Sequence, residues 1–335
     1  MNHANYYLLF DRIQIQAANA ISGPLSYGFP SLNGFLGAIH ALNRRLPESD
    51  GITLGGVLVA CHHCDVQLYR PHAYADATFN QSRNPLKKNG DTAAIIEEGK
   101  VHLTVSLLVE VRKADQVWAN LSQNPQASEW CTQVQNMLMQ QRIAGGSVTS
   151  IGRTQLFESH QQDDMIAALL PAFVLMDAGQ DLLAITRELQ TGQQHLVNEF
   201  DEIQPACDEN GAPLPSARPA QTEVTALDAL IEVATLHHLP PDAKDSKEWR
   251  AYSVKSGRGW LVPLPVGYQG IAAPFAAGEL AHCRTAEYPS QYVETIYSLG
   301  KWVFPFRLPE NFQQCFWRYA TPQDNLYLIT QPPAH

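Results

Sequence analysis

Two glycine-containing loops carry the residues of this sequence best suited to bind an anion. The first, Ala17 to Ser31, is rich in Gly and Pro and offers the polar side chains of Asn19 and Ser22. The second, Arg142 to Ser147, contains two successive glycines that let main-chain amides approach a ligand. An ordinary turn explains the first loop better, and a helix C-cap explains the second equally well. For the second loop, Arg142 before the glycines and Arg153 soon after them shift the balance toward an anion site.

Cysteine and histidine residues raise two further possibilities, a zinc site and a general base. The run Cys61 to Cys64 (CHHC) has zinc-ligand residue types, but residues three apart in a strand point to opposite faces and no second CxxC completes the set. His40, His102 and His160 are candidate bases, yet each lacks an adjacent Lys, Tyr or His. GxSxG, HExxH, Walker-A and GxGxxG patterns are absent. We therefore predict no catalytic residue, no metal and no cofactor.

The composition sets the class of protein. Hydrophobic residues make up 45% and charged residues 17% of the 335 residues, which is typical of a soluble globular chain. No apolar run is long enough to span a bilayer and the N-terminus suggests no export, so we expect a cytoplasmic protein without a membrane partner. The six cysteines are expected to be reduced thiols.

The net charge of −10 argues against a free-standing nucleic-acid binder, which usually carries a basic patch on a basic domain. If the chain binds nucleic acid, it must do so through local clusters, main-chain amides and a basic partner.

The elements that would position the two loops follow from hydrophobic periodicity. Ile13 and Ile15 alternate with polar residues from Arg12 to Gln16, as in a half-buried strand. Ser31 is the expected N-cap of a helix that continues to Leu42. Further strands are predicted over 51–69 and 101–111, and a helix over 126–142 that ends at Gly145-Gly146. This order is that of a ferredoxin-like or RRM-like sheet with both helices on one face.

The segment 71–100 interrupts this order and reads as a projecting loop or hairpin. Between Thr78 and Gly90 it contains Arg83, Lys87 and Lys88 and no acidic residue, which stands out in an acidic chain. Turn signals at Asn84-Pro85 and Asn89-Gly90 support a hairpin.

Beyond the second helix the pattern is less regular. We expect a strand over 171–176, a helix over 180–190, an acidic linker or mobile insertion over 198–219, and a helix from the N-cap Thr225 to His238. Strand-like aromatic sequence follows, in which Trp260 beside Arg258 is the candidate for base stacking. Three parts result: 1–190 with the hairpin 71–100, a linker and helical insertion over 191–258, and a β-rich aromatic part over 259–335.

Taken together, four stretches resemble a known family, the second Csy subunit of the type I-F CRISPR surveillance complex. They occur in the family's order over most of the chain, whereas residues 155–256 match loosely. The stretches are ANAISGPLSYGFPSLNGFLGAIHAL (Ala18 to Leu42), FNQSRNPLKKNGDTAAIIEEGKVHLTVSLL (Phe79 to Leu108), QRIAGGS (Gln141 to Ser147) and GWLVPLPVGY (Gly259 to Tyr268).

The resemblance implies an α+β, RRM-like fold of the RAMP type with a thumb-like hairpin. It implies a non-catalytic subunit that binds the 5′ handle of the CRISPR RNA in a heterodimer with the large Csy subunit. The hairpin would contact the Cascade backbone subunit, and target double-stranded DNA near the PAM is a further candidate partner. The expected RNA-binding residues are Arg12, Asn19, Ser22, Arg83, Asn84, Lys87, Arg142, Gly145, Gly146, Ser147 and Arg258.

A second function stays open at this point. Some Cascade cap subunits of the same fold cut the precursor of the guide RNA without a metal. An endoribonuclease of this kind would use His40 or His102 as its base.

Overall fold

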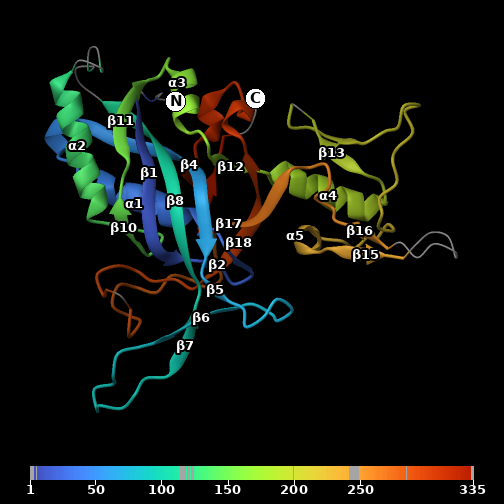
Figure 1. Cartoon of the computed structure of the whole chain (residues 1–335), viewed down its shortest axis with the longest axis horizontal. Coiled ribbons are helices and arrows are strands. Elements are labelled where there is room, and N and C mark those ends of the chain that lie inside the picture. The colour runs from blue at the N-terminus through green and yellow to red at the C-terminus, as the bar shows by residue number, and fades with distance from the viewer. Residues whose placement is uncertain are drawn as a thin grey trace. The chain divides into compact units, whose positions relative to one another are not determined.

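The chain forms two compact units in a computed structural model (Figure 1). The structure describes residues 4, 6–113, 118, 121, 124–198, 200–240, 249–283 and 285–332. The first unit comprises Met1–Val174, Phe304–Pro322 and Tyr327–Ile329, and the second comprises Leu175–Val303, Gln323–Leu326 and Thr330–His335. This division differs from the three predicted parts. Residues 175–190 belong to the second unit, together with the insertion and most of the aromatic part, whereas residues 304–322 belong to the first unit.

The first unit is built on an antiparallel sheet whose centre is the long strand β1 (Tyr6–Asn19). One edge of β1 pairs with β8 (Lys100–Lys113), which pairs in turn with β4 (Ile52–Val66). The other edge pairs with β10 (Gly146–Ser150) and β11 (Arg153–Glu158). From residue 12 to residue 16 β1 alternates between exposed and buried side chains, so the predicted half-buried strand is confirmed. It starts earlier than predicted, at Tyr6, and ends later, at Asn19, inside the predicted loop.

Two helices cover one side of this sheet. α1 (Leu32–Asn43) packs on β4, α2 (Pro125–Met139) packs on β10 and β11, and the helices contact each other. Both lie where hydrophobic periodicity predicts them. Ser31 occupies the N-cap position of α1 but makes no capping hydrogen bond, whereas the side chain of Asn124 caps α2. The apolar side chains Ile13 and Ile15 are buried, whereas Gln14 between them and Gln16 after them are exposed, which leaves a polar face of the sheet open.

Short elements complete the first unit and its borders. They are β2 (Ile21–Gly23), β3 (Ser26–Tyr27), η1 (Glu48–Asp50), β9 (Arg142–Ile143), α3 (Gln162–Ala168), β12 (Phe173–Asp177), η3 (Pro305–Arg307), η4 (Phe312–Cys315), β19 (Arg318–Gln323) and β20 (Leu326–Thr330). β12 overlaps the strand predicted over 171–176, and its first two residues pair with β4.

A hairpin extends from the end of the first unit's sheet, as Figure 1 shows. β5 (Leu68–Tyr69), β6 (Thr78–Arg83) and β7 (Ile95–Glu98) form a small antiparallel sheet of their own. The hairpin predicted within 71–100 is therefore confirmed by the pairing of β6 with β7.

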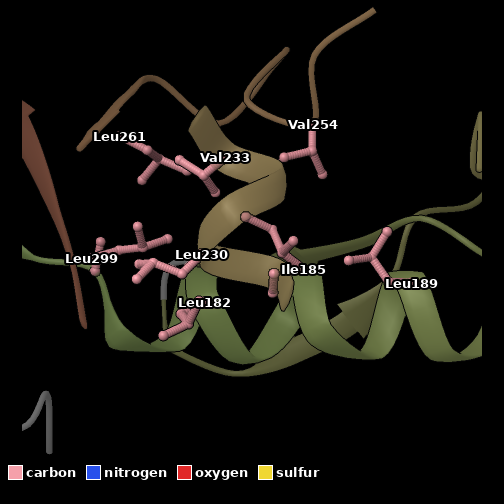
Figure 2. Packing of buried hydrophobic residues seen from close by; sticks show 10 residues of the cluster. Leu182, Ile185, Leu189, Leu230, Val233, Val254, Leu261 and Leu299 are labelled. Atoms are coloured by element: carbon pink, nitrogen blue, oxygen red, sulfur yellow. The ribbon is translucent and has the colours of Figure 1, made fainter. Parts of the chain in front are cut away.

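The second unit has its own core, drawn in Figure 2. α4 (Gly179–Thr191) and α5 (Ala226–Ala234) pack against the strand pair β17 (Trp260–Gly270) and β18 (Val293–Val303). Leu182, Ile185 and Leu189 of α4 meet Leu230 and Val233 of α5 in this core. α5 begins at the predicted N-cap, where Thr225 and Asp228 form a capping box.

The acidic segment predicted as a linker has a defined fold in the residues that the structure describes. It contains the hairpin of β13 (His195–Val197) and β14 (Ile203–Pro205), and the hydroxyl of Ser216 donates a hydrogen bond of 2.7 Å to Glu188 on α4. A second short pair follows, β15 (His237–Leu239) with β16 (Arg250–Tyr252). Among the helices described, none has the length and apolar character needed to cross a membrane.

Candidate nucleic-acid interface

The loop after β1 is held rigidly between two other parts of the first unit. The main-chain N–H of Asn19 donates a hydrogen bond of 2.8 Å to Ala144, and that of Ala20 donates one of 2.9 Å to Gly99 at the base of the hairpin. The exposed side chain of Asn19 bonds to the main chain of Ile21, and Ser22 bonds to Ser26. The loop therefore presents polar groups in a fixed arrangement.

The Gly-Gly loop turns out to be a β-hairpin turn. α2 already ends at Met139, so its expected end at Gly145-Gly146 is wrong. Ala144 and Gly145 both have positive φ, 49° and 79°, and connect β9 to β10 as the two-residue turn of a hairpin. The turn packs against β1, because a Cβ on Gly146 would lie 2.6 Å from a methyl carbon of Ile15.

The pairing of β9, β10 and β1 places three polar side chains in one row. Ser147 lies opposite Arg142 on one side and opposite Gln16 on the other. Residues directly opposite in antiparallel strands point to the same face. Asn19, which lies opposite Lys100, and all three residues of the row are on exposed or half-exposed positions of the open face.

Next to this row the open face has a shallow depression of about 350 Å³, which we call the polar depression. Strands β1, β4, β8 and β10 contribute to it. Its lining residues are Gln14, Ile15, Gln16, His63, His102, Leu103, Thr104 and Thr149. Hydrogen-bonding groups dominate it and no carboxylate lines it.

A main-chain contact fixes the hydrogen-bonding state of His102. Its Nδ1 accepts a hydrogen bond of 3.1 Å from the main-chain N–H of Ala17. Ala17 has a positive φ of 55° at an irregularity between β1 and β8, which turns this N–H toward β8. In the neutral ring the proton then lies on Nε2, so His102 offers a donor to the depression.

Arg12 belongs to a polar network farther along β1. The buried Asp11 carboxylate lies 3.0 Å from the guanidinium of Arg12 and 3.4 Å from that of Arg153, and both guanidinium side chains are about half exposed. Ser106 donates a hydrogen bond of 3.0 Å to Asp11 and lies 2.8 Å from the Nε2 of His62. Two arginine side chains are thus anchored by one buried carboxylate.

The hairpin tip carries Arg83, Asn84 and Lys87 at exposed positions. They come from the end of β6 and the turn that follows it, away from the row on β9, β10 and β1. The base of the hairpin touches the loop after β1, where the rings of Tyr27 and Phe79 lie 5.4 Å apart.

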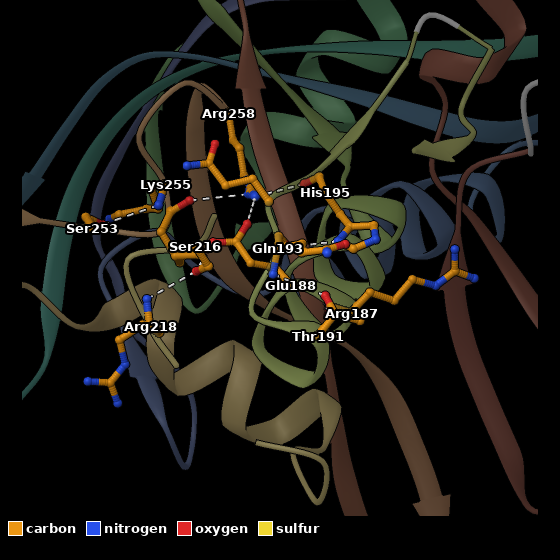
Figure 3. Close-up of polar contacts among 12 residues, drawn as sticks. Arg187, Glu188, Thr191, Gln193, His195, Ser216, Arg218, Ser253, Lys255 and Arg258 are labelled. Atoms are coloured by element: carbon orange, nitrogen blue, oxygen red, sulfur yellow. Dashed lines mark hydrogen bonds and ion pairs between the residues drawn. The ribbon is translucent and has the colours of Figure 1, made fainter. Parts of the chain in front are cut away.

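Arg258 and Trp260 belong to the second unit. The Arg258 side chain is only 4% exposed and forms a hydrogen-bonded ion pair with Glu188 (Figure 3). It also donates a hydrogen bond of 2.8 Å to the carbonyl of His195. Trp260 is 59% exposed and lies opposite Trp302 across β17 and β18. Arg258 therefore has a structural role within the second unit, and stacking on Trp260 stays a prediction.

The other chemistry-bearing residues lie apart. Burial, then the neighbouring Cys64, raises the pKa of Cys61 to about 12, so this thiol is protonated at neutral pH. Within the part of the chain that the structure describes, no group of three His, Cys, Asp or Glu residues could hold a metal ion. His40 is exposed on α1 beside Tyr319, and His160 lies beside Glu158.

The prediction from sequence missed the polar depression as a site. The alternation of Gln14 and Gln16 signals an exposed polar face, but their meeting with His63, His102 and Thr149 depends on strand pairing. Of the predicted residues, Asn19, Arg142, Gly145, Gly146 and Ser147 are brought together, and Ser22 lies in the short strand β2, shortly after Asn19 in the chain.

These features define a mixed α+β protein that presents an open, hydrogen-bonding sheet face beside two rigid loops. The sequence model of the family described as "CRISPR-associated protein (Cas_Csy2)" matches residues 8–329. The chain is also 33% identical over 344 residues to "CRISPR-associated protein Csy2" of Pseudomonas aeruginosa (strain UCBPP-PA14), covering 97% of this chain and 95% of that protein. The chain therefore belongs to the Csy2 family of CRISPR-associated proteins, the family of a subunit of the type I-F Csy complex.

Proposed function

We propose that this chain is the non-catalytic subunit that binds the 5′ handle of the guide RNA in a type I-F Csy complex. Membership of the Csy2 family supports the complex, and the open face of the first unit supports the RNA. The main observation in support of RNA binding is the row of Arg142, Ser147 and Gln16, which lies beside Asn19 and the polar depression.

The topology of the first unit supports an RRM-like fold of the RAMP type. The chain order β1, α1, β4, β8, α2, β11 is the β-α-β-β-α-β order of ferredoxin-like domains. Domains of this architecture bind single-stranded RNA on the sheet face opposite their helices. In this chain that face is the one lined by Gln14, Gln16 and His102.

The charge distribution fits an RNA terminus held mainly by polar groups. Single-stranded RNA is recognised by splaying bases into pockets while phosphates are clamped. Here Arg142 and the turn at Gly145 and Ser147 serve the RNA backbone, and Arg12 with Arg153 offers a second cationic point on the same sheet. An acidic chain can bind RNA in this way when its partners supply further positive charge.

The remaining partners follow from family membership and from exposed surfaces. We assign the hairpin tip with Arg83, Asn84 and Lys87 to RNA phosphates or to the Cascade backbone subunit. The large Csy subunit forms the heterodimer, and the pair helps to position target DNA near the PAM. The place of action is the cytoplasm.

Co-expression tests this function. The chain is produced with and without the large subunit and the guide RNA, and the products are separated by size-exclusion chromatography with the absorbance ratio at two wavelengths as the measure of nucleic acid. We expect one complex that retains RNA. Material that shows neither retained RNA nor affinity for a repeat-derived leader, even with the large subunit, contradicts the proposal.

A metal-independent endoribonuclease is the second candidate, because His63 and His102 line one depression and imidazoles supply acid and base catalysis. Against it, the hydrogen bond from Ala17 leaves the outward nitrogen of neutral His102 as a donor. Incubation with repeat RNA in a chelator decides between the two. Cleavage that is lost in His102→Ala or His40→Ala supports the enzyme, and binding without product supports the cap.

A further inference from the structure

We infer that the polar depression is a recognition pocket for one nucleobase, which it identifies by hydrogen bonds rather than by stacking. This inference rests on the proposed RNA binding and adds a place and a chemistry for sequence preference. The depression lies on the open face, and its volume of about 350 Å³ falls at the lower end of small-ligand pockets.

The lining of the depression matches the edge of a base. His102 contributes an Nε2 donor that the bond from Ala17 fixes in place. Gln14 and Gln16 contribute amides with both a donor and an acceptor, and Thr104 and Thr149 contribute hydroxyls. The hydroxyl of Thr149 is oriented by its 3.2 Å hydrogen bond to the carbonyl of Gln14. Such a set can pair with the donors and acceptors of a base edge.

The polar depression lacks the Phe, Tyr and Trp rings of the usual stacking platform, and its only aromatic lining residues are His63 and His102. Sheet-face RNA binders place aromatic rings under two or three bases. In the polar depression, glutamines take the exposed positions of β1 instead. Stacking is tolerant of base identity, whereas hydrogen bonds to a base edge distinguish one base from another.

The charged groups nearest the depression are one carboxylate and two guanidinium groups. Asp65 of β4 lies opposite His102 and its carboxylate accepts a hydrogen bond of 2.8 Å from Gln67, and Arg12 and Arg153 lie farther along the sheet. No Asp or Glu lines it, and the carboxylate of Asp11 farther along β1 is occupied by Arg12, Arg153 and Ser106. Arg12 lies two residues from Gln14 on the same strand, roughly 7 Å away at the usual rise of a strand. Arg12 donates hydrogen bonds of 3.0 Å to Asp11 and to the carbonyl of Leu170, and its half-exposed side chain is the nearest arginine on that strand for a phosphate next to the bound base.

Fluorescence anisotropy with labelled eight-nucleotide RNAs tests the pocket, using the full chain with the large subunit. The probes are A8, C8, U8 and alternating (GU)4. We expect the wild type to prefer one of them by about tenfold, the discrimination that one or two hydrogen bonds to a base edge provide. His102→Phe, which keeps a planar ring but removes the donor, should reduce this preference to about twofold or less.

A second variant keeps the test independent of folding. Gln14→Ala with Gln16→Ala changes only exposed side chains and should also flatten the preference, while the matched control His160→Phe, far from the depression, should leave it unchanged. Equal wild-type affinity for all four probes overturns the pocket alone, as does an undiminished preference in the glutamine variant. Absence of any RNA binding by the wild type overturns both the pocket and the proposed function.

Discussion

The guanidinium of Arg258 and the carboxylate of Glu188 form an ion pair in the interior of the second unit, 70 positions apart in the chain. Ser216 and Tyr252 donate further hydrogen bonds to Glu188, of 2.7 Å and 3.3 Å. Burial, and then the charge of Glu188, raises the pKa of Tyr252, so its hydroxyl stays a donor at neutral pH. The pair joins α4 to the segment before β17 and stabilises the second unit.

Replacing Arg258 tests this role. Arg258→Gln should lower the free energy of unfolding by about 3–5 kcal/mol, because it leaves a buried carboxylate without its cation. Urea denaturation followed by circular dichroism measures the change, with the exposed Arg187→Gln on the same helix as Glu188 as control. Wild-type stability combined with weaker RNA binding would instead place Arg258 in the RNA site.

Gly146 is expected to tolerate no side chain. Gly146→Ala would place a Cβ 2.6 Å from Ile15 and 2.7 Å from the main-chain nitrogen of Ala18, so β10 must shift from β1. We expect a loss of about 1–3 kcal/mol in stability, as for overpacked cores. Thermal unfolding compares it with Gly37→Ala in α1, where no atom lies within 4 Å and alanine should stabilise the helix by up to about 1 kcal/mol. Equal effects of the two changes would contradict the packing argument.

His62 should make stability depend on pH. Burial, and then the positive charge of Arg12, lowers the pKa of His62 from the ordinary value of 6.5. A folded-state pKa below the unfolded one means that the neutral ring is favoured in the fold. The contribution to stability is complete above pH 6.5 and is lost as the pH falls through the folded-state pKa.

Denaturation at a series of pH values measures this effect. His62→Gln keeps an N–H for Ser106 and does not titrate, so its stability should fall less than that of the wild type as the pH is lowered from 6.5. His160→Gln, which removes an exposed histidine outside the network of Asp11 and Ser106, serves as the control. If the stability of His62→Gln and that of the wild type depend on pH in the same way, His62 is not the source of the pH dependence.

The basic hairpin tip should contribute to RNA-dependent assembly. Arg83→Glu with Lys87→Glu reverses two exposed charges, so assembly with guide RNA should weaken and its dependence on salt should become shallower. The control variant, Arg44→Glu with Arg187→Glu, changes the net charge by the same amount at exposed positions outside the hairpin. Size-exclusion chromatography over a series of salt concentrations measures the assembly. If the hairpin variant assembles as the wild type does at every salt concentration, the hairpin tip is not part of the interface.

Local pattern was enough to predict the long strands β1, β4 and β8 and the helices α1, α2, α4 and α5, but not β10, β11 or α3. The alternation around Ile13 and Ile15, the helical spacing after Ser31 and the capping box at Thr225 each depend on residues within a few positions of one another. The family, too, follows from stretches of sequence in order, without a structure. The chemistry of single loops could be described in the same way, but their ligand could not.

Tertiary pairing decided the role of the residues that matter most. Gly145 and Gly146 follow a helix in the chain, yet Gly145 lies in a hairpin turn and Gly146 begins β10, which pairs with β9 and with β1. Arg258 is adjacent to a glycine on each side, yet it is buried because Glu188 lies on α4. The polar depression unites four strands whose residues are far apart in sequence. Strand register and burial are set by contacts over such separations, which no local window of sequence contains.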